Sequence, residues 1–485
     1  MKLTTLLDQM PYTIIQGDID VEVLHLSHVS SQIQEGTLFF CIQGFQTDGH
    51  DYAKQVIEEG AVAIVVEKLL EGLPEGVTVI QVENTRESMA YITAKFYEQP
   101  SSYMNLVGVT GTNGKTTTTF LISSILETAD RKTGIIGTIE NRVGKKRIPS
   151  DRTTPDSLEL QKLFLQMKDE NVEDVIMEVS SHSLALHRVT GCHFKVAVFT
   201  NLTLDHLDFH KTMENYKSAK AKLFGQCEHA VINLDDEAAE DMIKVSKGKI
   251  ITYGIEKDAD IKAYNIRITA TGVTFTVNIS HEPLEFQLRI PGKFSVYNGL
   301  AAIATCLTLG LPPSIIQEGL AHVSGVPGRF QTLRSPMDYS VIIDYAHAPD
   351  GLENVLTTVR QFATGRVITV FGCGGDRDKS KRPIMGKIAG QHSNFCVLTS
   401  DNPRSEDPCQ ILREIEQGIK DTDCPYTKIV DRKQGILFAL QEARPKDIVI
   451  IAGKGHENYQ EFENNRRVHF DDVEIVEAYL QEETE

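Results

Sequence analysis

The sequence predicts an α/β protein of three domains. Short apolar runs such as residues 61–66, which follows a helix-like stretch over 52–59, recur along the chain. This alternation of strands and helices is typical of parallel sheets covered by helices. A length of 485 residues exceeds what one hydrophobic core usually organises. Segments rich in Pro, Gly and Ser interrupt the alternation twice, so we expect domains at 1–103, 104–331 and 332–485.

The first interruption is EQPSSY at residues 98–103, between a helical pattern and the next strand. The second is VSGVPGRFQTLRSP at 323–336, after which a new strand is expected over 339–344. Pro and Gly end periodic elements because they remove a backbone donor or add conformational freedom. Both segments are therefore expected to be domain boundaries.

Composition excludes several classes of function. Hydrophobic residues make up 41% and charged residues 24%, which is typical of a globular protein, and the net charge is −18. An acidic chain has no general electrostatic reason to bind nucleic acid or an anionic membrane. The eight cysteines form no CxxC pair, which favours reduced core thiols in a cytoplasmic protein. No apolar run reaches the length of a signal-peptide core or a membrane span, so no membrane insertion is expected.

The segment LVGVTGTNGKTTTT, residues 106–119, places an apolar strand before a Gly-rich turn and a helix. Gly111 and Gly114 would present backbone N–H groups to phosphates, Lys115 would add a charge, and Thr116 would offer a hydroxyl to Mg²⁺. This arrangement predicts ATP binding. The general Walker pattern needs Gly at position 109, where this chain has Val109, so a plain Gly-rich turn is the alternative.

Acidic and histidine side chains follow two later strands. Glu178 stands at the end of an expected strand over 174–179, where it could orient Mg²⁺ or be an ordinary acid beside a buried strand. The segment VFTNLTLDHLDFH then brings four candidate ligands close together in the sequence. Their spacing does not fit a zinc site, and some are expected to be helix caps or solvated surface residues: Asp205, His206, Asp208 and His210.

Seven motifs occur in the order seen in the Mur ligase family of peptidoglycan synthetases: GTNGKTT, MEVSSHSL, TNLTLDHLDFH, YKSAKAKLF, PGKFSVYNGLAA, GVPGRF and DYAHAPD. The resemblance extends from HVSSQIQEGTLFF to GKGHE and covers nearly the whole chain. The GTNGKTT loop is this family's own variant of the Walker motif. The resemblance implies a central P-loop-type parallel sheet, a Rossmann-like C-terminal domain and ATP-dependent amide-bond formation by a monomer.

The resemblance also implies roles for the ATP and metal residues. Lys220, in the YxxAK motif, would be carbamylated and act as an anionic oxygen ligand, although by itself it would be read as a solvated helix lysine. The implied magnesium ligands are Thr116, Glu178, His206 and Lys220, and the implied catalytic residues are Lys115, Glu178, His206 and Lys220. The implied ATP contacts are Gly111, Thr112, Asn113, Gly114, Lys115, Thr116, Thr117, Asn298, Arg329 and Asp344, with His347 beside the last.

Two further substrates are implied. UDP-MurNAc-L-Ala-D-Glu would bind Ser30, Thr153, Thr154, Ser180 and Arg188, although the chain has Val29-Ser30-Ser31 where the family often has Asp-Ser-Arg. The DNPR motif is similar to that of members that add meso-diaminopimelate. Its Arg404 would bind the distal carboxylate, which lysine lacks, so lysine would leave Arg404 unpaired. The full implied set is Arg377, Asp401, Asn402, Pro403, Arg404, Gly453 and Glu457.

Several alternatives remain at this stage. Arg404 could make a surface ion pair with Glu406 or Asp407. The strand RVITVF followed by GCGGDRD superficially resembles a dinucleotide fingerprint, which would suit an NAD-linked oxidoreductase. A non-catalytic nucleotide-binding module and the folylpolyglutamate synthetase branch share the ATP motifs. The DNPR and GKGHE motifs favour the peptidoglycan branch.

Overall fold

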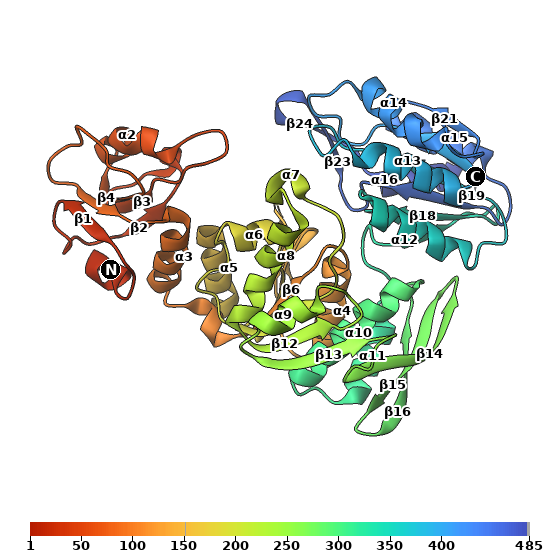
Figure 1. Ribbon diagram of the computed structural model, residues 1–485, viewed down its shortest axis with the longest axis horizontal. Coiled ribbons are helices and arrows are strands. Elements are labelled where there is room, and N and C mark those ends of the chain that lie inside the picture. Colours follow the sequence, from red (N-terminus) through yellow and green to blue (C-terminus); the bar gives the residue numbers. More distant parts are fainter. Residues whose placement is uncertain (151, 483–485) are drawn as a thin grey trace. The chain divides into compact units, whose positions relative to one another are not determined.

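The computed structural model describes residues 1–150 and 152–482, and its strands and helices alternate along the chain (Figure 1). This confirms the α/β class. The chain divides into two compact units. The first contains residues 1–108, 131–197 and 222–228, and the second contains 109–130, 198–221 and 229–485. The predicted boundaries at 103 and 331 stay predictions.

The first unit begins with a five-stranded sheet of order β1-β5-β4-β3-β2. Strand β1 is antiparallel to β5, whereas the remaining pairings are parallel. The strands are β1 Thr13–Gln16, β2 His25–Ser27, β3 Thr37–Phe40, β4 Ala61–Val66 and β5 Thr78–Gln81. The helices are α1 Leu3–Leu7, η1 Ser30–Gln32, η2 Gly49–Tyr52, α2 Ala53–Glu58, α3 Thr85–Phe96 and η3 Pro100–Tyr103.

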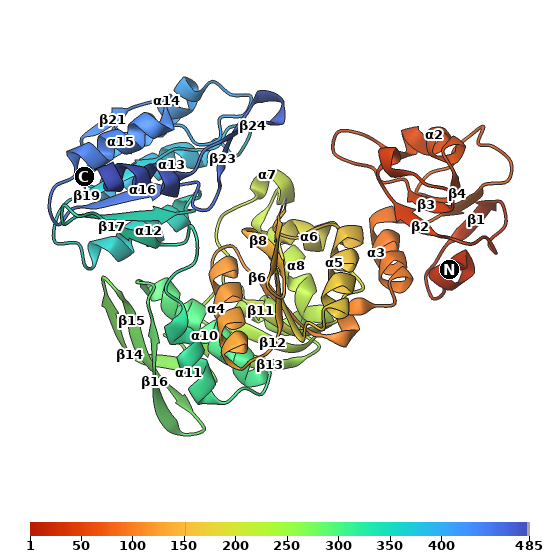
Figure 2. The ribbon, with the colours of Figure 1, turned by 180° about the vertical axis from the view of Figure 1, so that it is seen from behind.

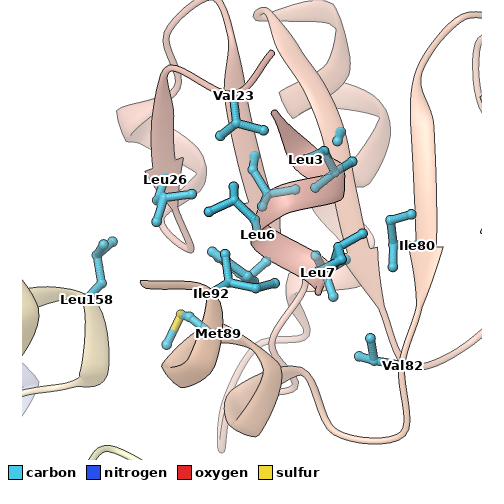
Figure 3. Close-up of a cluster of buried hydrophobic side chains, with 14 residues drawn as sticks. Leu3, Leu6, Leu7, Val23, Leu26, Ile80, Val82, Met89, Ile92 and Leu158 are labelled. Carbon is cyan, nitrogen blue, oxygen red and sulfur yellow. The ribbon is translucent and has the colours of Figure 1, made fainter. Parts of the chain in front are cut away.

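Alternate side chains of this sheet enter two separate cores, as the two-residue period of a strand requires. In β4, Ala63 and Val65 belong to one buried cluster with Leu6 of α1 and Ile92 of α3. Figure 3 shows Leu6 and Ile92 in this cluster. The intervening β4 residues pack with α2 on the opposite face. Asn84 caps helix α3: its side chain accepts hydrogen bonds from the backbone N–H groups of Arg86 and Glu87. Helices therefore cover both faces, as the continuous apolar run of 61–66 predicts.

A second sheet of eleven strands has the order β16-β15-β14-β13-β12-β11-β6-β10-β7-β8-β9. Its strands are β6 Asn105–Thr110, β7 Thr133–Ile136, β8 Glu140–Val143, β9 Lys146–Pro149, β10 Asp174–Glu178, β11 Phe194–Phe199, β12 Cys227–Asn233, β13 Lys249–Gly254, β14 Ile261–Thr269, β15 Gly272–Ile279 and β16 Glu282–Leu288. The pairings β7–β10 and β12–β13 are parallel, whereas β14–β15–β16 and β7–β8–β9 are antiparallel. The sequence predicted the parallel part of this sheet.

The helices that follow these strands are mostly short, apart from α4, α5 and α10. They are α4 Lys115–Thr128, α5 Ser157–Asp169, α6 Ser181–Ala185, α7 Leu207–His210, α8 Met213–Ala221, η4 Lys222–Gln226, α9 Ala239–Val245, α10 Lys293–Thr308 and α11 Pro313–His322. In the second unit, α4 packs against α10 and α11 (Figure 2). A Cβ on Gly319 of α11 would lie 2.5 Å from the Cα of Ile125 in α4. The helix that follows the phosphate loop is therefore held by close backbone packing.

The third sheet has the order β17-β18-β22-β19-β20-β21, in which β17 is antiparallel and the other pairings are parallel. It contains β17 Gln331–Arg334, β18 Ser340–Asp344, β19 Val367–Phe371, β20 Phe395–Leu398, β21 Tyr426–Lys428 and β22 Ile448–Ala452. Its helices are α12 Pro349–Arg360, α13 Lys381–His392, α14 Pro408–Ile419, α15 Arg432–Glu442 and α16 Asp472–Glu482. A hairpin of β23 Tyr459–Phe462 and β24 Arg466–His469, joined by η5 Glu463–Asn465, completes the set. The parallel sheet with its helices confirms the Rossmann-like class.

A buried ion pair joins the last two long helices. Arg432 of α15 donates to both carboxylate oxygens of Asp472 in α16, at 2.9 and 2.7 Å, and both side chains are fully buried. We expect Arg432→Met to destabilise this sheet by about 3–5 kcal/mol, because Asp472 would be left as an unpaired buried charge. Denaturant unfolding monitored by circular dichroism would measure the change.

Arg413→Met is the matched control, since Arg413 pairs with Asp407 at 3.4 Å with both side chains more than half exposed. An exposed pair contributes roughly 0–1 kcal/mol. An equal decrease in the free energy of unfolding in the two variants would contradict the assignment of the buried pair as a stabilising contact.

Candidate functional site

The phosphate loop lies between β6 and α4, as the sequence predicts. Gly111 and Gly114 have φ of 151° and 84°, and a Cβ on either would collide with a neighbouring side chain, Thr200 or Asn298 respectively. Lys115 folds back over the loop, and its Nζ donates to the carbonyl oxygens of Gly111 at 3.0 Å and Thr112 at 2.9 Å. The loop is therefore fixed both by close packing and by its own lysine.

A cavity of about 380 Å³ opens beside this loop in the second unit. Six of the predicted ATP residues line it: Asn113, Gly114, Thr117, Asn298, Arg329 and Asp344. Other lining residues were not among the predicted ATP contacts, and they include Asp235, Phe294, Tyr297 and Asp350. Asp350 accepts hydrogen bonds from Asn113 and Thr203. Asp350 is the last residue of the DYAHAPD motif, so the motif could have indicated it as a site residue.

Arg329 connects the loop helix to the third sheet. Its Nη2 donates to Thr116 Oγ1 at 3.1 Å, and its guanidinium stacks 4.4 Å from the ring centre of Tyr345. Asp344 accepts hydrogen bonds from the backbone N–H groups of Phe330 and Ala346. Burial raises the pKa of Asp344, although Arg329 opposes that shift. Asp344 thus fixes the segment that carries Arg329 while also lining the cavity.

Lys220, at the end of α8, is fully buried, so its interpretation as a solvated helix lysine is wrong. Its Nζ donates to the Gly111 carbonyl oxygen at 2.7 Å, which is also the acceptor for Lys115. Burial lowers the pKa of Lys220 well below its ordinary value, and the nearby Lys115 lowers it further. A neutral amine is the form that can react with carbon dioxide, so the setting suits the carbamylation that the resemblance implies.

The segment with four candidate metal ligands adopts a turn before the short helix α7. His206 has a φ of 54°, and its Nε2 lies 3.5 Å from Asp205 Oδ2. Its ring lies edge-on to the Tyr216 ring of α8. Asp208 is in the first turn of α7 and His210 is buried. Within residues 1–150 and 152–482, no three His, Cys, Asp or Glu side chains gather closely enough to hold a metal ion.

In the first unit, four of the five predicted residues of the nucleotide-sugar site, Thr153, Thr154, Ser180 and Arg188, belong to one hydrogen-bonded group that includes Glu178 and Thr138. Glu178 is buried, and its two carboxylate oxygens accept from the backbone N–H and the hydroxyl of Thr138 at 2.8 and 3.0 Å. Thr154 donates to the Glu178 carbonyl oxygen at 2.8 Å and accepts from Ser180 N–H at 3.1 Å. Arg188 Nη1 donates to the Thr154 carbonyl oxygen at 2.9 Å. The Thr153 hydroxyl lies 3.0 Å from that of Thr138.

Ser30 belongs to η1, in the five-stranded sheet region, and is half-buried. His28, two residues earlier, lies 3.8 Å from Asp156, the residue that caps α5. Burial, and then the nearby Arg152, lower the pKa of Arg188. Arg86 and Arg152 add positive charge near Arg188. Neither was predicted as a site residue, because neither belongs to a recognisable sequence motif.

The predicted amino-acid residues gather at the ends of β20 and β22. Asn402 Nδ2 donates to Glu457 Oε2 at 2.9 Å, and Lys454 Nζ donates to Asn402 Oδ1 and Glu457 Oε2, both at 3.0 Å. Lys454 is fully buried. It was not among the predicted amino-acid-binding residues, although it belongs to the GKGHE motif. Gly453 has a φ of 115°, and a Cβ there would lie 2.5 Å from Asp401 Oδ2. Burial is the largest single effect and raises the pKa of Asp401, but Lys454, Arg432 and the Asn402 backbone N–H together outweigh it, so this pKa lies below its ordinary value.

Arg404 is paired in this structure, but not as expected. Its Nε donates to Glu461 Oε2 at 2.7 Å and its Nη1 to the Gly375 carbonyl oxygen at 2.8 Å. The alternative pairing with Glu406 or Asp407 is wrong: Glu406 binds the buried Arg382 instead. The expectation that Arg404 lacks a partner without a distal carboxylate is also wrong. Arg377 is exposed and donates to the Asp376 carbonyl oxygen.

The cysteines and the apolar helices bear on the expectations drawn from composition. All eight cysteines are free, and seven are buried as predicted, whereas Cys409 is exposed at the start of α14. None of the helices in the described ranges is long and apolar enough to cross a bilayer.

The chain is similar to known proteins over nearly its whole length. Residues 22–97 match the Mur ligase family catalytic domain, 109–306 the Mur ligase middle domain, and 328–455 the Mur ligase glutamate ligase domain. The UDP-N-acetylmuramoyl-L-alanyl-D-glutamate–2,6-diaminopimelate ligase of Caldanaerobacter subterraneus subsp. tengcongensis is 48% identical over 483 residues, which cover 99% of each chain.

Two solved structures are also similar. A UDP-N-acetylmuramoyl-L-alanyl-D-glutamate–2,6-diaminopimelate ligase matches with a TM-score of 0.72 and 32% identity, over 100% of this chain and 99% of that one. The MurF ligase from Thermotoga maritima, solved in complex with ADP, matches with a TM-score of 0.64 and 18% identity, over 96% and 98% of the two chains. At 18% identity the second match supports the fold alone.

We expect Gly114→Ala to weaken ATP binding at least about tenfold, because the new methyl group would collide with Asn298 and displace the loop. Isothermal titration calorimetry with ATP would measure the dissociation constant. Gly310→Ala is the matched control: its φ of 83° is nearly the 84° of Gly114, but a Cβ there meets nothing within 4 Å. Both variants carry the same backbone strain of roughly 1 kcal/mol. Equal loss of ATP binding in both would contradict the steric argument.

Proposed function

The chain belongs to the Mur ligase family, and from this premise we infer that it is an ATP-dependent ligase. The reaction proposed is the joining of meso-diaminopimelate to UDP-MurNAc-L-Ala-D-Glu in peptidoglycan precursor synthesis. A relative of 48% identity over 99% of the chain bears the name of this ligase. The structural observation that carries the proposal is the convergence of Lys115 and Lys220 on the Gly111 carbonyl at the phosphate loop.

The first chemical step proposed is attack of the D-glutamate γ-carboxylate on the γ-phosphorus of ATP, which gives an acyl phosphate and ADP. Phosphoryl transfer needs positioning and neutralisation of charge more than covalent help from the protein. Lys115 lies over the loop and could turn from its backbone acceptors to the γ-phosphate. Arg329, held against Thr116 and Tyr345, would supply a second positive charge.

The second step proposed is attack of a diaminopimelate amine on the acyl carbon through a tetrahedral intermediate, from which phosphate leaves. The cluster of Asp401, Asn402, Lys454 and Glu457 would orient the amino acid. Its two carboxylates and one lysine leave an excess of negative charge, which suits a substrate ammonium group. Closure of the third domain over the nucleotide, which would exclude water from the acyl phosphate, stays a prediction.

Mg²⁺ is the cofactor proposed, and the donors present suit it. Mg²⁺ prefers hard oxygen ligands, and Thr116 offers a hydroxyl while the buried Lys220 would offer carbamate oxygens after reaction with carbon dioxide. When bound, the ion would neutralise charge on the transferring phosphate. His206 and Glu178 stay predictions as its further ligands. Glu178 is buried, and Thr138 donates two hydrogen bonds to its carboxylate.

The nucleotide sugar would bind the group formed by Thr153, Thr154, Ser180 and Arg188. Arg188, with Arg86 and Arg152 nearby, provides the positive charge that a diphosphate or carboxylate requires. A cytoplasmic location is proposed because ATP and nucleotide-linked precursors are cytoplasmic metabolites. The monomeric state stays a prediction, for which light scattering is the test.

We expect ATP-dependent phosphate release and a coupled product of the right mass when the protein receives UDP-MurNAc-L-Ala-D-Glu and meso-diaminopimelate. Parallel reactions contain L-lysine in place of meso-diaminopimelate, or no amino acid. A preference for lysine would keep the ligase and overturn the specificity. Absence of product with both would overturn the proposed function.

Lys115→Ala should reduce the rate at least about 100-fold, because a charge placed at the transferring phosphoryl group is lost. Lys247→Ala removes an exposed lysine of the same unit and should leave the rate unchanged. Full activity of Lys115→Ala would contradict the assignment of the loop.

A further inference from the structure

Glu461, on β23, shares Arg404 with the proposed amino-acid site. The side-chain contact of 2.7 Å between Arg404 Nε and Glu461 Oε2 is accompanied by a backbone hydrogen bond of 3.0 Å from Arg404 N–H to the Glu461 carbonyl oxygen. The two side chains are 20% and 13% exposed, so water screens the pair only in part. The pair is built into the fold by both backbone and side chains.

The backbone around the pair is also constrained. Arg404 has a φ of 52°, in the left-handed region that few residues other than Gly, Asn and Asp adopt. Its Nη1 donates to the Gly375 carbonyl oxygen at 2.8 Å, and a Cβ on Gly374 would lie 3.0 Å from Nη1. The guanidinium therefore has little freedom to leave Glu461 while staying at the site.

Glu461 is also connected to the rest of the cluster. Its backbone N–H donates to Asn402 Oδ1 at 3.0 Å, the same oxygen that accepts from Lys454. A second cation, Arg467, approaches Glu461 Oε1 at 4.0 Å, but its side chain is 50% exposed. The Glu461 carboxylate thus lies at the edge of the group that would hold the amino acid, where a substrate carboxylate bound to Arg404 would meet it.

The energetic consequence concerns substrate choice. A carboxylate that approaches Arg404 must either displace Glu461 from the guanidinium or share the guanidinium with it. Displacement costs an existing charge-assisted bond, and sharing places two negative charges close together. A substrate without a distal carboxylate leaves the Arg404–Glu461 pair intact, so the half-buried guanidinium keeps its partner.

We propose that Glu461 is a specificity-determining residue, which competes with the distal carboxylate of the amino-acid substrate for Arg404. This rests on the proposed function. Glu461 lowers the affinity for meso-diaminopimelate and reduces the penalty for lysine. It therefore sets how strictly the enzyme distinguishes the two.

The test is the variant Glu461→Gln, which keeps the side-chain shape and removes the charge. We expect the KM for meso-diaminopimelate to fall about tenfold, the KM for ATP to stay unchanged, and the ratio of kcat/KM for meso-diaminopimelate over lysine to rise by a similar factor. A purely structural role would instead raise the KM for both amino acids together. Glu463→Gln is the matched control, because it removes an exposed charge from the same hairpin.

Glu461→Asp provides a second variant if the Gln variant folds poorly. It retains the charge but shortens the side chain by one methylene, so the contact with Arg404 is weakened and the ratio should rise by a smaller factor. An unchanged ratio in whichever variant folds, or a parallel loss for both amino acids, would overturn the role of Glu461. Absence of any product from the wild-type protein would instead overturn the proposed function, and the two failures are therefore distinguishable.

Discussion

The backbone carbonyl of Gly111 is the acceptor on which the phosphate-loop region depends. Lys115 and Lys220 both donate to it, at 3.0 and 2.7 Å, although they come from different helices. Burial lowers the pKa of Lys220, and repulsion from the nearby Lys115 amine lowers it further, so Lys220 is shifted toward its neutral form. The absence of a side chain at Gly111 is what lets the loop approach Thr200 and expose this carbonyl to both amines.

The cluster proposed to orient the amino acid, Asp401, Asn402, Lys454 and Glu457, has an excess of negative charge, whereas two lysines meet at the phosphate loop. Two pairs there are internally neutral: Arg432 with Asp472, and Arg404 with Glu461. The remaining charges are those of the buried Asp401 and Lys454 and the half-buried Glu457, which leave an excess of one negative charge. Asp401 keeps its ionised form because Lys454 and Arg432 lower its pKa against the effect of burial. Such a cluster is stable only with a cation nearby, which is the property expected of a site for an ammonium group.

Local and distant signals explain which features the sequence could predict. Strand β6, the phosphate loop and α4 were predictable because the glycines, Lys115 and the following helix lie within a few residues of each other. The strands β4, β10 and β18 could be predicted because each is a short apolar run, which is typical of a buried parallel strand. The burial of Lys220 was not, because its acceptor lies 109 residues earlier in the chain. The pairing of Arg404 depends on Glu461, 57 residues away, and no local pattern indicates it.

The glycines of GCGGDRD show how a motif can be explained by packing rather than by a cofactor. A Cβ on Gly372 would collide with the Thr399 carbonyl oxygen, and one on Gly375 with that of Pro403. Thr399 lies just before DNPR and Pro403 is part of it, and Gly375 also supplies the carbonyl oxygen that accepts from Arg404. The small residues are needed so that the loop after β19 can lie against the loop after β20. The resemblance to a dinucleotide fingerprint is therefore accounted for by the positioning of Arg404, and it gives no support to an oxidoreductase.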